Sequence, residues 1–424
     1  MIDLPEKFVS RMRDQLGGEA EQFLASYAQP PYKGVRVNTL KISPQDFLNL
    51  GLFETQPVPW ESNGFYVDDE KPGKNVFHAA GLYYVQEPSA MCVAPLLGVK
   101  PGERVLDLCS APGGKGTQMA QAMRGEGIIF LNEINFSRAK ILSRNVERLG
   151  ITNAVVTCAE PQKLARIFEN YFDKILVDAP CSGEGMFRKQ PEAVEEWSEQ
   201  NVHSCAERQS KILESAAKML AADGSMVYST CTFSEEEDEE RVRTFLSSHC
   251  DFSLVEERRI FPHRQKGEGH YAALMKKSGG ERSDIKLLRP TADKKMLAPA
   301  LDFLKKTVRT DFKNIHSVGG TLYSLPDEMP DIPVQTLRAG ICLGTVTGGR
   351  FEPDHALAMC LTPDSAQCVE VDEVTALKYL AGETFACAEE LSGWKVVTHK
   401  GFPLGWCKCV NGTAKNHLPK GIRI

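Results

Sequence analysis

Between residues 76 and 278, short apolar runs alternate with stretches whose apolar residues recur at helical spacing. Glycine, proline or polar residues bound most of these segments, as expected where strands and helices end. Buried strands that alternate with helices indicate a doubly wound, mostly parallel α/β sheet. The expected strands are 104–108, 127–131, 154–158, 174–177 and 225–229, and the expected helices are 117–123, 136–149 and 207–220.

The segments on either side of this core have different patterns. Residues 1–75 predict a helix over 19–27 and an alternating strand over 34–40, which leaves Arg36 and Asn38 opposite the buried face. After the core, a polar, glycine-containing linker precedes one helix and several short strands. We therefore expect four units. Their expected bounds are 1–75, 76–278, 285–360 and 365–424.

The chain has 424 residues, of which 42% are hydrophobic and 25% charged, a composition typical of soluble globular proteins. No apolar run is long enough to span a bilayer and the first residues lack a secretory signal, so we expect a cytoplasmic protein without a membrane partner. The 13 cysteines are odd in number and have no framework spacing, which favours reduced thiols. The Cys407-x-Cys409 pair has no second pair at zinc-site spacing, so we expect two thiols on a strand and no metal.

Charge is unevenly distributed along this acidic chain, whose formal net charge is −6. Residues 395–424 contain six lysines and arginines and no acidic residue, which indicates either a local polyanion site or a solvated tail. In the run 235–240, by contrast, every residue is acidic. We expect that run to be a solvated helix start, where carboxylates suit the positive end of the helix dipole.

The segment after the first core strand has the residues of a nucleoside-binding turn. Gly113 and Gly114 let the backbone pass close to a ligand, and Glu133 ends the second strand, where an acid can bind ribose hydroxyls. A nicotinamide dinucleotide site shares this layout, but the G-x-G-x-x-G fingerprint and the G-x-x-x-x-G-K-[ST] phosphate loop are both missing. A nucleoside without a diphosphate fits better, and S-adenosylmethionine is the common one.

Two cysteines each follow an apolar run directly. Cys181 lies in a D-A-P-C-S-G segment that begins at Asp178, and Cys231 lies in a Y-S-T-C-T segment. Carbon 5 of cytosine is a poor nucleophile, but attack of a thiolate on C6 makes the ring an enamine that can take a methyl group from a sulfonium. Asp178 can hydrogen-bond the N3 edge of such a ring. The residues alone leave open which cysteine attacks.

These segments, together with residues 84–89, resemble the NOL1/NOP2/Sun family of RNA cytosine-5 methyltransferases. Residues 185–189, 267–271 and 415–421 resemble its bacterial branch, which modifies small-subunit ribosomal RNA. The resemblance extends over nearly the whole chain. It implies a Rossmann-like class I methyltransferase core, a small N-terminal α/β domain that contacts RNA near Arg36 and Asn38, and a C-terminal α+β extension that ends in a PUA-like β-barrel.

The resemblance also assigns roles to individual residues. It implies that Cys231 is the nucleophile and that Cys181 assists release of the methylated product. It further implies that S-adenosylmethionine is bound by Cys109, Ala111, Pro112, Gly113, Gly114, Lys115, Glu133, Arg138, Glu160 and Asp178. At Glu160, for which the resemblance implies a contact with adenine, the family more usually has Asp.

The expected partner is RNA, in particular 16S ribosomal RNA or the small ribosomal subunit. Trp394 and Trp406 are expected to fill the core of the C-terminal unit, so that neighbouring lysines such as Lys395 and Lys408 carry the RNA-binding hypothesis. Two alternatives remain. One is a non-catalytic RNA-binding or ribosome-assembly factor that retains the fold, and the other is a nicotinamide-dependent oxidoreductase.

Overall fold

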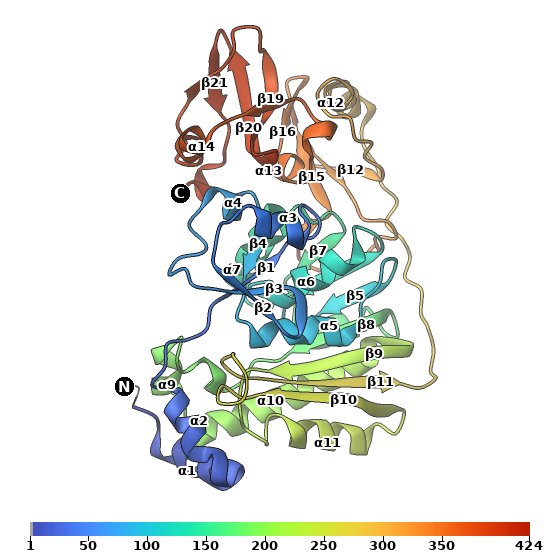
Figure 1. The fold of residues 1–424 in the computed structure, drawn as a ribbon. Helices are drawn as coiled ribbons and strands as arrows, with labels where there is room; N and C mark the ends of the chain where they lie inside the picture. Colours follow the sequence, from blue (N-terminus) through green and yellow to red (C-terminus); the bar gives the residue numbers. More distant parts are fainter. Residues whose placement is uncertain (1–2) are drawn as a thin grey trace.

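The computed structural model describes residues 3–424, so the first two residues of the expected unit 1–75 lie outside the described part. An eight-stranded sheet in the order β10-β11-β9-β8-β5-β6-β7-β14 forms the core (Figure 1). Its strands are β5 (Arg104–Asp107), β6 (Ile128–Asn132), β7 (Ala154–Thr157), β8 (Phe172–Asp178), β9 (Leu220–Thr230), β10 (Phe252–Ile260), β11 (His270–Lys277) and β14 (Thr336–Ala339). The five strands from β9 to β7 are parallel, and the other three are antiparallel additions at the two edges. The predicted doubly wound core is confirmed.

Helices cover both faces of this sheet. One face packs against α5 (Val93–Leu97), α6 (Gly114–Met123) and α7 (Phe136–Arg148), and the other against α8 (Pro161–Ala165), α10 (Glu199–Met219) and α11 (Glu239–Ser248). Helix α7 begins where the side chain of Asn135 accepts the backbone N–H groups of Ser137 and Arg138, which satisfies donors left free at a helix start. It ends at Arg148, shortly before Gly150, whose φ is +71°. Each face of the sheet is therefore buried, as its continuous apolar strands predict.

The N-terminal unit divides into two parts. Helices α1 (Glu6–Leu16) and α2 (Ala20–Ser26) lie at the bottom of Figure 1, where Phe8 and Phe23 join an apolar cluster with Phe187 and Phe233. The rest forms a sheet in the order β2-β3-β1-β4. Its elements are β1 (Gly34–Val37), α3 (Pro44–Asn49), β2 (Thr55–Val58), β3 (Glu61–Val67), α4 (Val76–Ala79) and β4 (Tyr83–Val85). The predicted small α/β unit is confirmed.

The expectation that Arg36 and Asn38 face away from the buried side is wrong, because both residues are fully buried. Arg36 donates hydrogen bonds to the carbonyl of Gly114 and to Oγ1 of Thr117 at 2.9 Å. Asn38 donates to the carbonyls of Gly81 and Leu149, at 2.8 and 2.9 Å. These polar side chains connect the N-terminal sheet to the core, so neither is free to contact RNA.

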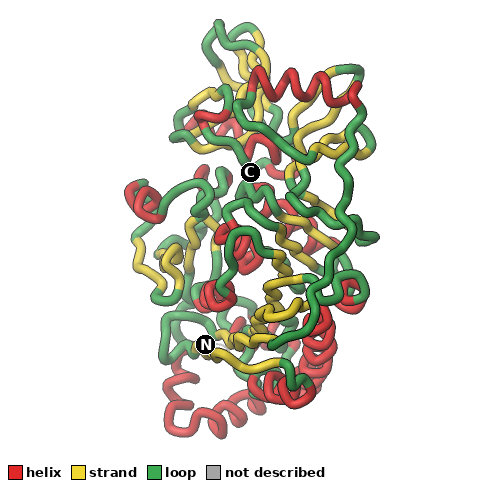
Figure 2. Tube along the Cα trace, turned by 90° about the vertical axis from the view of Figure 1, so that its right-hand side faces the viewer, coloured by secondary structure: helices red, strands yellow, loops and turns green. Residues whose placement is uncertain are grey.

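The C-terminal part consists of two strand-rich units at the top of Figures 1 and 2. The first contains α12 (Lys294–Thr307), β12 (Ile315–Val318), β13 (Thr321–Ser324), β15 (Ile341–Thr347), β16 (Arg350–Pro353) and α13 (His355–Met359). The second contains β17 (Cys368–Glu370), α14 (Glu373–Leu380), β18 (Phe385–Ala386), β19 (Gly393–His399), β20 (Phe402–Val410) and β21 (Thr413–Asn416). Strand β14 leaves the first unit to pair with β7 of the core, an exchange that the chain's local pattern does not reveal.

The last unit also packs on the N-terminal sheet. Its Tyr379 and Val397 share one apolar cluster with Val35 and Phe77. Trp406 is buried and Trp394 half-buried, as expected of core residues. Cys407 and Cys409 lie on β20 with their sulfur atoms 4.0 Å apart, which confirms two thiols on a strand. In the described part of the chain, no group of three or more potential ligands is arranged to hold a metal, and no helix is long and apolar enough to cross a membrane.

We predict that Arg36→Ala lowers the free energy of unfolding by about 3–5 kcal/mol, because several buried acceptors lose their only charged donor. Urea titration followed by tryptophan fluorescence measures this change. Arg13→Ala serves as the matched control. Arg13 lies on the exposed face of α1 and pairs with Glu21 of α2, so its loss should leave the urea midpoint nearly unchanged. Equal midpoints for the two variants would contradict the connecting role of Arg36.

Candidate active site

The glycine turn follows β5, the strand at which the order of the sheet reverses. Strand β6 lies on one side of β5 and β8 on the other. Gly113 has φ +112°, a conformation that glycine adopts without strain, and a Cβ there would lie 2.9 Å from Leu142. Under the first turn of α6, both carboxylate oxygens of Asp107 and Oγ of Ser110 are buried without a hydrogen-bond partner. Burial raises the pKa of Asp107 to about 7. The turn lies at the carboxyl ends of the parallel strands, which form the edge of an open α/β sheet where ligands bind.

Arg138 connects the end of β6 to the same turn through contacts with Glu133 and Ala111. Glu133 is 5% exposed and accepts the backbone N–H of Asn135 at 2.9 Å. Its carboxylate lies 3.4 Å from Arg138, which donates to the carbonyl of Ala111 at 2.7 Å. Burial, together with the nearby acids, raises the pKa of the partly buried Cys109 thiol, so this cysteine stays neutral. The turn residues and Glu133 are thus brought together, as predicted.

Glu160 differs from Glu133 although both follow core strands. It is exposed, at the residue before α8, whereas Glu133 is buried. An exposed carboxylate keeps its hydration, so a hydrogen bond from it stabilises a ligand less than one from a buried group. Its predicted contact with the cofactor remains a prediction.

At the end of β8, Asp178 forms an ion pair with Lys115, with 2.8 Å between Nζ and Oδ2. Ser229 on β9 donates to the other oxygen of Asp178 at 2.8 Å. Burial alone would raise the pKa of Asp178, but the Lys115 ammonium, together with the hydrogen bond from Ser229, outweighs it and lowers the pKa. Burial also tends to lower the pKa of Lys115, and Asp178 reverses this effect, so both groups stay charged. The pair therefore presents one fixed cation and one fixed anion beside the thiols.

His270 is a site residue that sequence reasoning missed. Its side chain is 3% exposed, and Nε2 lies 3.8 Å from Oδ1 of Asp178 without a hydrogen-bond partner. Burial, with a further contribution from Lys115, lowers its pKa to about 3, so the imidazole is neutral. The sequence of residues 267–271 was informative about the family, but only the pairing of β11 with β9 brings His270 to this edge.

The two thiols meet at adjacent strand ends. Sγ of Cys181 lies 3.4 Å from Sγ of Cys231, and both residues are partly exposed. The backbone N–H of Gly185 donates to the carbonyl of Cys231 at 2.8 Å, which joins the two loops. The hydrogen bond to Cys231 and burial raise the pKa of the Cys181 thiol well above its usual range. Cys181 therefore tends to keep its proton, and either sulfur can be the donor in the contact between the two thiols.

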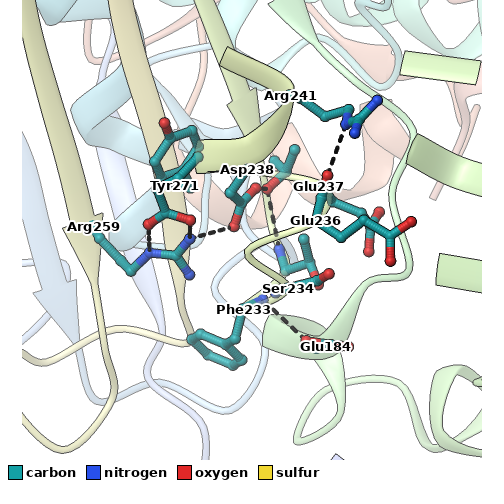
Figure 3. A network of polar contacts seen from close by, with 12 residues as sticks. Glu184, Phe233, Ser234, Glu236, Glu237, Asp238, Arg241, Arg259 and Tyr271 are labelled. Carbon is teal, nitrogen blue, oxygen red and sulfur yellow. Dashed lines mark hydrogen bonds and ion pairs between the residues drawn. The ribbon is translucent and has the colours of Figure 1, made fainter. Parts of the chain in front are cut away.

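The acidic run 235–240 was expected to be solvated, and this expectation is wrong for its central residues. Glu237 and Asp238 are fully buried, and Figure 3 shows them directed into a network of polar groups. Asp238 lies 2.7 Å from a guanidinium nitrogen of Arg259. Glu237 accepts the backbone N–H of Ser182 at 3.0 Å and an amide hydrogen of Gln209 at 2.9 Å. Burial raises the pKa of Glu237 to about 7. The run does begin a helix, with Glu239 and Glu240 in the first turn of α11, so the expected helix start is confirmed. The helix dipole does not explain why Glu237 and Asp238 are buried.

Comparisons with known proteins agree with this architecture. Four family models match consecutive parts of the chain: the 16S rRNA methyltransferase RsmB/F over residues 94–276, the N-terminal domain of RsmF over 4–88, its first C-terminal domain over 302–361 and its PUA domain over 366–424. Ribosomal RNA small subunit methyltransferase F of Vibrio cholerae is 31% identical over 99% of this chain and 98% of the relative. That of Shewanella loihica is 30% identical over 100% and 96%.

The chain belongs to the methyltransferase F family. Among solved structures, a methyltransferase homologue from Pyrococcus horikoshii has a TM-score of 0.59 and 29% identity, and covers 65% of this chain and 96% of its own. NSun6 from the same organism has the same TM-score at 21% identity, which supports the fold. The predicted Rossmann-like methyltransferase core and the C-terminal PUA-like unit are confirmed.

S-adenosylmethionine is the cofactor of this methyltransferase, and the residues present fit it. The turn at Gly113 admits a ligand close to the backbone, and Glu133, at the end of the next strand, offers a buried carboxylate at the sequence offset from the turn that is typical of an acid that binds ribose hydroxyls. The unpaired polar atoms of Asp107 and Ser110 offer further acceptors beside it. The roles of individual residues in binding remain predictions.

We predict that Glu133→Gln weakens binding of S-adenosylmethionine roughly 10- to 100-fold, because a buried charged acceptor contributes about 1.5–3 kcal/mol to a hydrogen bond. Isothermal titration calorimetry measures the affinity. Glu160→Gln is the matched control, the same substitution at the exposed end of the next strand, and should change the affinity less than about twofold. A larger loss at Glu160 than at Glu133 would contradict the assignment.

A second prediction concerns pH. Because the folded-state pKa of Glu237, about 7, lies above the unfolded value, its contribution to stability is fully present at low pH and is lost as pH rises through 7. Between about pH 5.5 and 8 the free energy of unfolding of the wild type should fall by about 2 kcal/mol more than that of Glu237→Gln. Urea titrations at both pH values measure this difference, and parallel curves for the two proteins would refute it.

Proposed function

We propose that this protein transfers the methyl group of S-adenosylmethionine to carbon 5 of cytosine in small-subunit ribosomal RNA, through a covalent adduct with a cysteine. The observation that carries the proposal is the 3.4 Å separation of the two thiols, beside the Lys115–Asp178 pair and at the same sheet edge as the glycine turn. The names of the relatives support ribosomal RNA as substrate. When bound, S-adenosylmethionine supplies an electrophilic methyl group.

In the proposed reaction, the thiolate of Cys231 adds to C6 of the cytosine. Asp178, which Lys115 keeps ionised and oriented, accepts a hydrogen bond from the 4-amino group at the N3 edge of the ring. The addition converts the ring to an enamine, and its C5 then takes the methyl group. A proton leaves C5, the C6–S bond breaks, and the Cys231 thiolate is released as the ring regains aromaticity.

The proposed division of labour between the thiols is the one that the family resemblance implies, with Cys231 as nucleophile and Cys181 as the group that assists release. While Cys231 is a thiolate, its charge and the hydrogen bond between the two sulfur atoms raise the pKa of Cys181, so Cys181 keeps its proton during the attack. Once Cys231 has become a thioether, it no longer carries this negative charge. Cys181 can then lose its proton to solvent and accept the proton from C5.

RNA binding is proposed for the units at both ends of the chain, 1–75 and 365–424. In the C-terminal unit the candidate cations are the exposed ones. Lys408 is exposed and lies over the ring of Trp394 at 5.6 Å, whereas Lys395 is buried and donates to the carbonyl of Ser392. Lys408 therefore remains a candidate for phosphate contact and Lys395 does not. A cytoplasmic location, where ribosomal RNA is found, remains part of the proposal.

We predict that Cys231→Ala abolishes methyl transfer, whereas Cys181→Ala performs the first step and leaves protein covalently attached to RNA. Denaturing gel electrophoresis of the reaction detects the adduct, and transfer of a radiolabelled methyl group measures activity. Cys250→Ala, at an exposed cysteine outside the site, should keep wild-type turnover without an adduct. Normal turnover by Cys181→Ala, or an adduct in Cys231→Ala, would reverse or eliminate the assigned roles.

A further inference from the structure

The loops that carry the two thiols exchange hydrogen bonds through buried carboxylates. Glu237, which follows Cys231 in the chain, accepts the backbone N–H of Ser182 in the Cys181 loop at 3.0 Å. It also accepts the hydroxyl hydrogen of Ser182. In return Glu184, which follows Cys181, accepts the backbone N–H of Phe233 in the Cys231 loop at 3.1 Å (Figure 3). Each loop thus supplies the acceptor for a backbone donor of the other.

Neither carboxylate is free to move. Glu184 is fully buried and also binds Arg11 of α1 at 2.6 Å and the indole nitrogen of Trp197 at 2.8 Å. Glu237 accepts a hydrogen from Gln209 of α10, and the same amide donates to the carbonyl of Pro180 at 3.1 Å. Gln209 therefore supports Glu237 and the turn before Cys181 at the same time. Burying a carboxylate costs desolvation free energy, so stability alone does not explain why these two are present. Their hydrogen bonds indicate that they fix the positions of the two loops.

Two further contacts connect this arrangement to the thiols. The hydroxyl groups of Ser182 and Thr232, the residues directly after the two cysteines, lie 2.8 Å apart. Thr230, directly before Cys231, donates its hydroxyl hydrogen to Asp238. The residues flanking both cysteines are therefore fixed by side chains of the acidic run or of Glu184, and the sulfur atoms have little freedom to separate.

We propose that Glu184 and Glu237 are positioning residues that hold the Cys181 thiol within reach of the Cys231 adduct, so that product release depends on them. The inference rests on the proposed function and adds a requirement to its last step. In the proposed reaction, attack by Cys231 on the cytosine does not involve Cys181, whereas release of the product needs Cys181 at the reacting carbon. A displacement of about 1 Å can slow a reaction about 100-fold, so release is the step most sensitive to loosening.

The test uses Glu237→Gln, because the amide preserves the shape but replaces one acceptor oxygen with a donor. Small ribosomal subunits from cells that lack the gene, and deproteinised 16S rRNA from the same cells, serve as substrates at pH 8. We expect the first turnover and the affinity for S-adenosylmethionine to stay within about threefold of wild type. Steady-state turnover should fall roughly 10- to 100-fold, and a covalent protein–RNA adduct should accumulate on denaturing gels.

The matched control is Glu235→Gln, the same substitution two residues earlier in the acidic run at an exposed position. It should turn over like the wild type without an adduct. If Glu237→Gln does not fold, Ser182→Ala replaces it. This variant removes the hydroxyl contacts of Ser182 with Glu237 and Thr232 but keeps the backbone N–H bond to Glu237, so it should give the same adduct in a smaller amount. Accumulated adduct with a preserved first turnover supports the proposal.

Two results would overturn it. One is normal steady-state turnover in Glu237→Gln, and the other is an equal loss of first and later turnovers without an adduct, which is the signature of a merely structural role. Cys181→Ala run in parallel separates this inference from the proposed function. If Cys181→Ala traps an adduct and Glu237→Gln does not, only the positioning role fails. If neither traps one, the covalent mechanism itself fails.

Discussion

The parallel pairing of β8 with β9 determines where every reacting group of this protein lies. Asp178 is opposite Ser229 in the register, and their side chains are hydrogen-bonded. Cys181 follows Asp178 by three residues and Cys231 follows Ser229 by two, so both thiols leave the sheet at the same edge. A slip of one residue would turn Asp178 to the other face and separate it from Lys115. The pairing of β5 with β8 brings the glycine turn to this edge as well.

Charged groups around this edge are buried at a cost that apolar residues would avoid. Lys115 and Asp178 neutralise each other, Arg259 pairs with Asp238, and Arg11 pairs with Glu184. Replacing such pairs by packed hydrophobic residues is often neutral or stabilising in other proteins, so stability alone does not explain them. These groups fix the positions of the loops, because a carboxylate that accepts several hydrogen bonds holds the groups that donate them in one arrangement. Glu237 and Asp238, the buried residues of the acidic run, therefore contribute to the geometry of the site.

The core was predictable because its signals are local. The strands from β5 to β9 are short apolar runs with clear boundaries. Ligands bind at the carboxyl ends of parallel strands, and this rule places the glycine turn, Asp178 and both cysteines together from the sequence alone. The remainder depends on partners far along the chain. Arg36 was expected to be exposed because β1 alternates, but its acceptors lie in α6. The alternation of a short strand does not show that a second layer covers its polar face.

Contacts with residues far along the chain also explain why the sequence does not predict the burial of the acidic run or the place of His270 in the site. Glu237 is buried by contacts with residues near 182 and 209, and nothing within the run itself distinguishes it from its exposed neighbour Glu235. His270 reaches Asp178 only through the antiparallel strand β11, whose register is not visible in the sequence. The order of the two thiols rests on family resemblance alone, because the 3.4 Å contact between their sulfur atoms is symmetric and either sulfur can be the donor.

The most direct test of the account uses RNA that contains 5-fluorocytidine, because fluorine at C5 blocks the elimination and traps the adduct on the wild-type enzyme. Peptide mass spectrometry after nuclease digestion then identifies the cysteine that is bonded to the base. The account predicts a methylated fluoropyrimidine on Cys231 and an unmodified Cys181. A base attached to Cys181, or no adduct in the presence of S-adenosylmethionine, would contradict it.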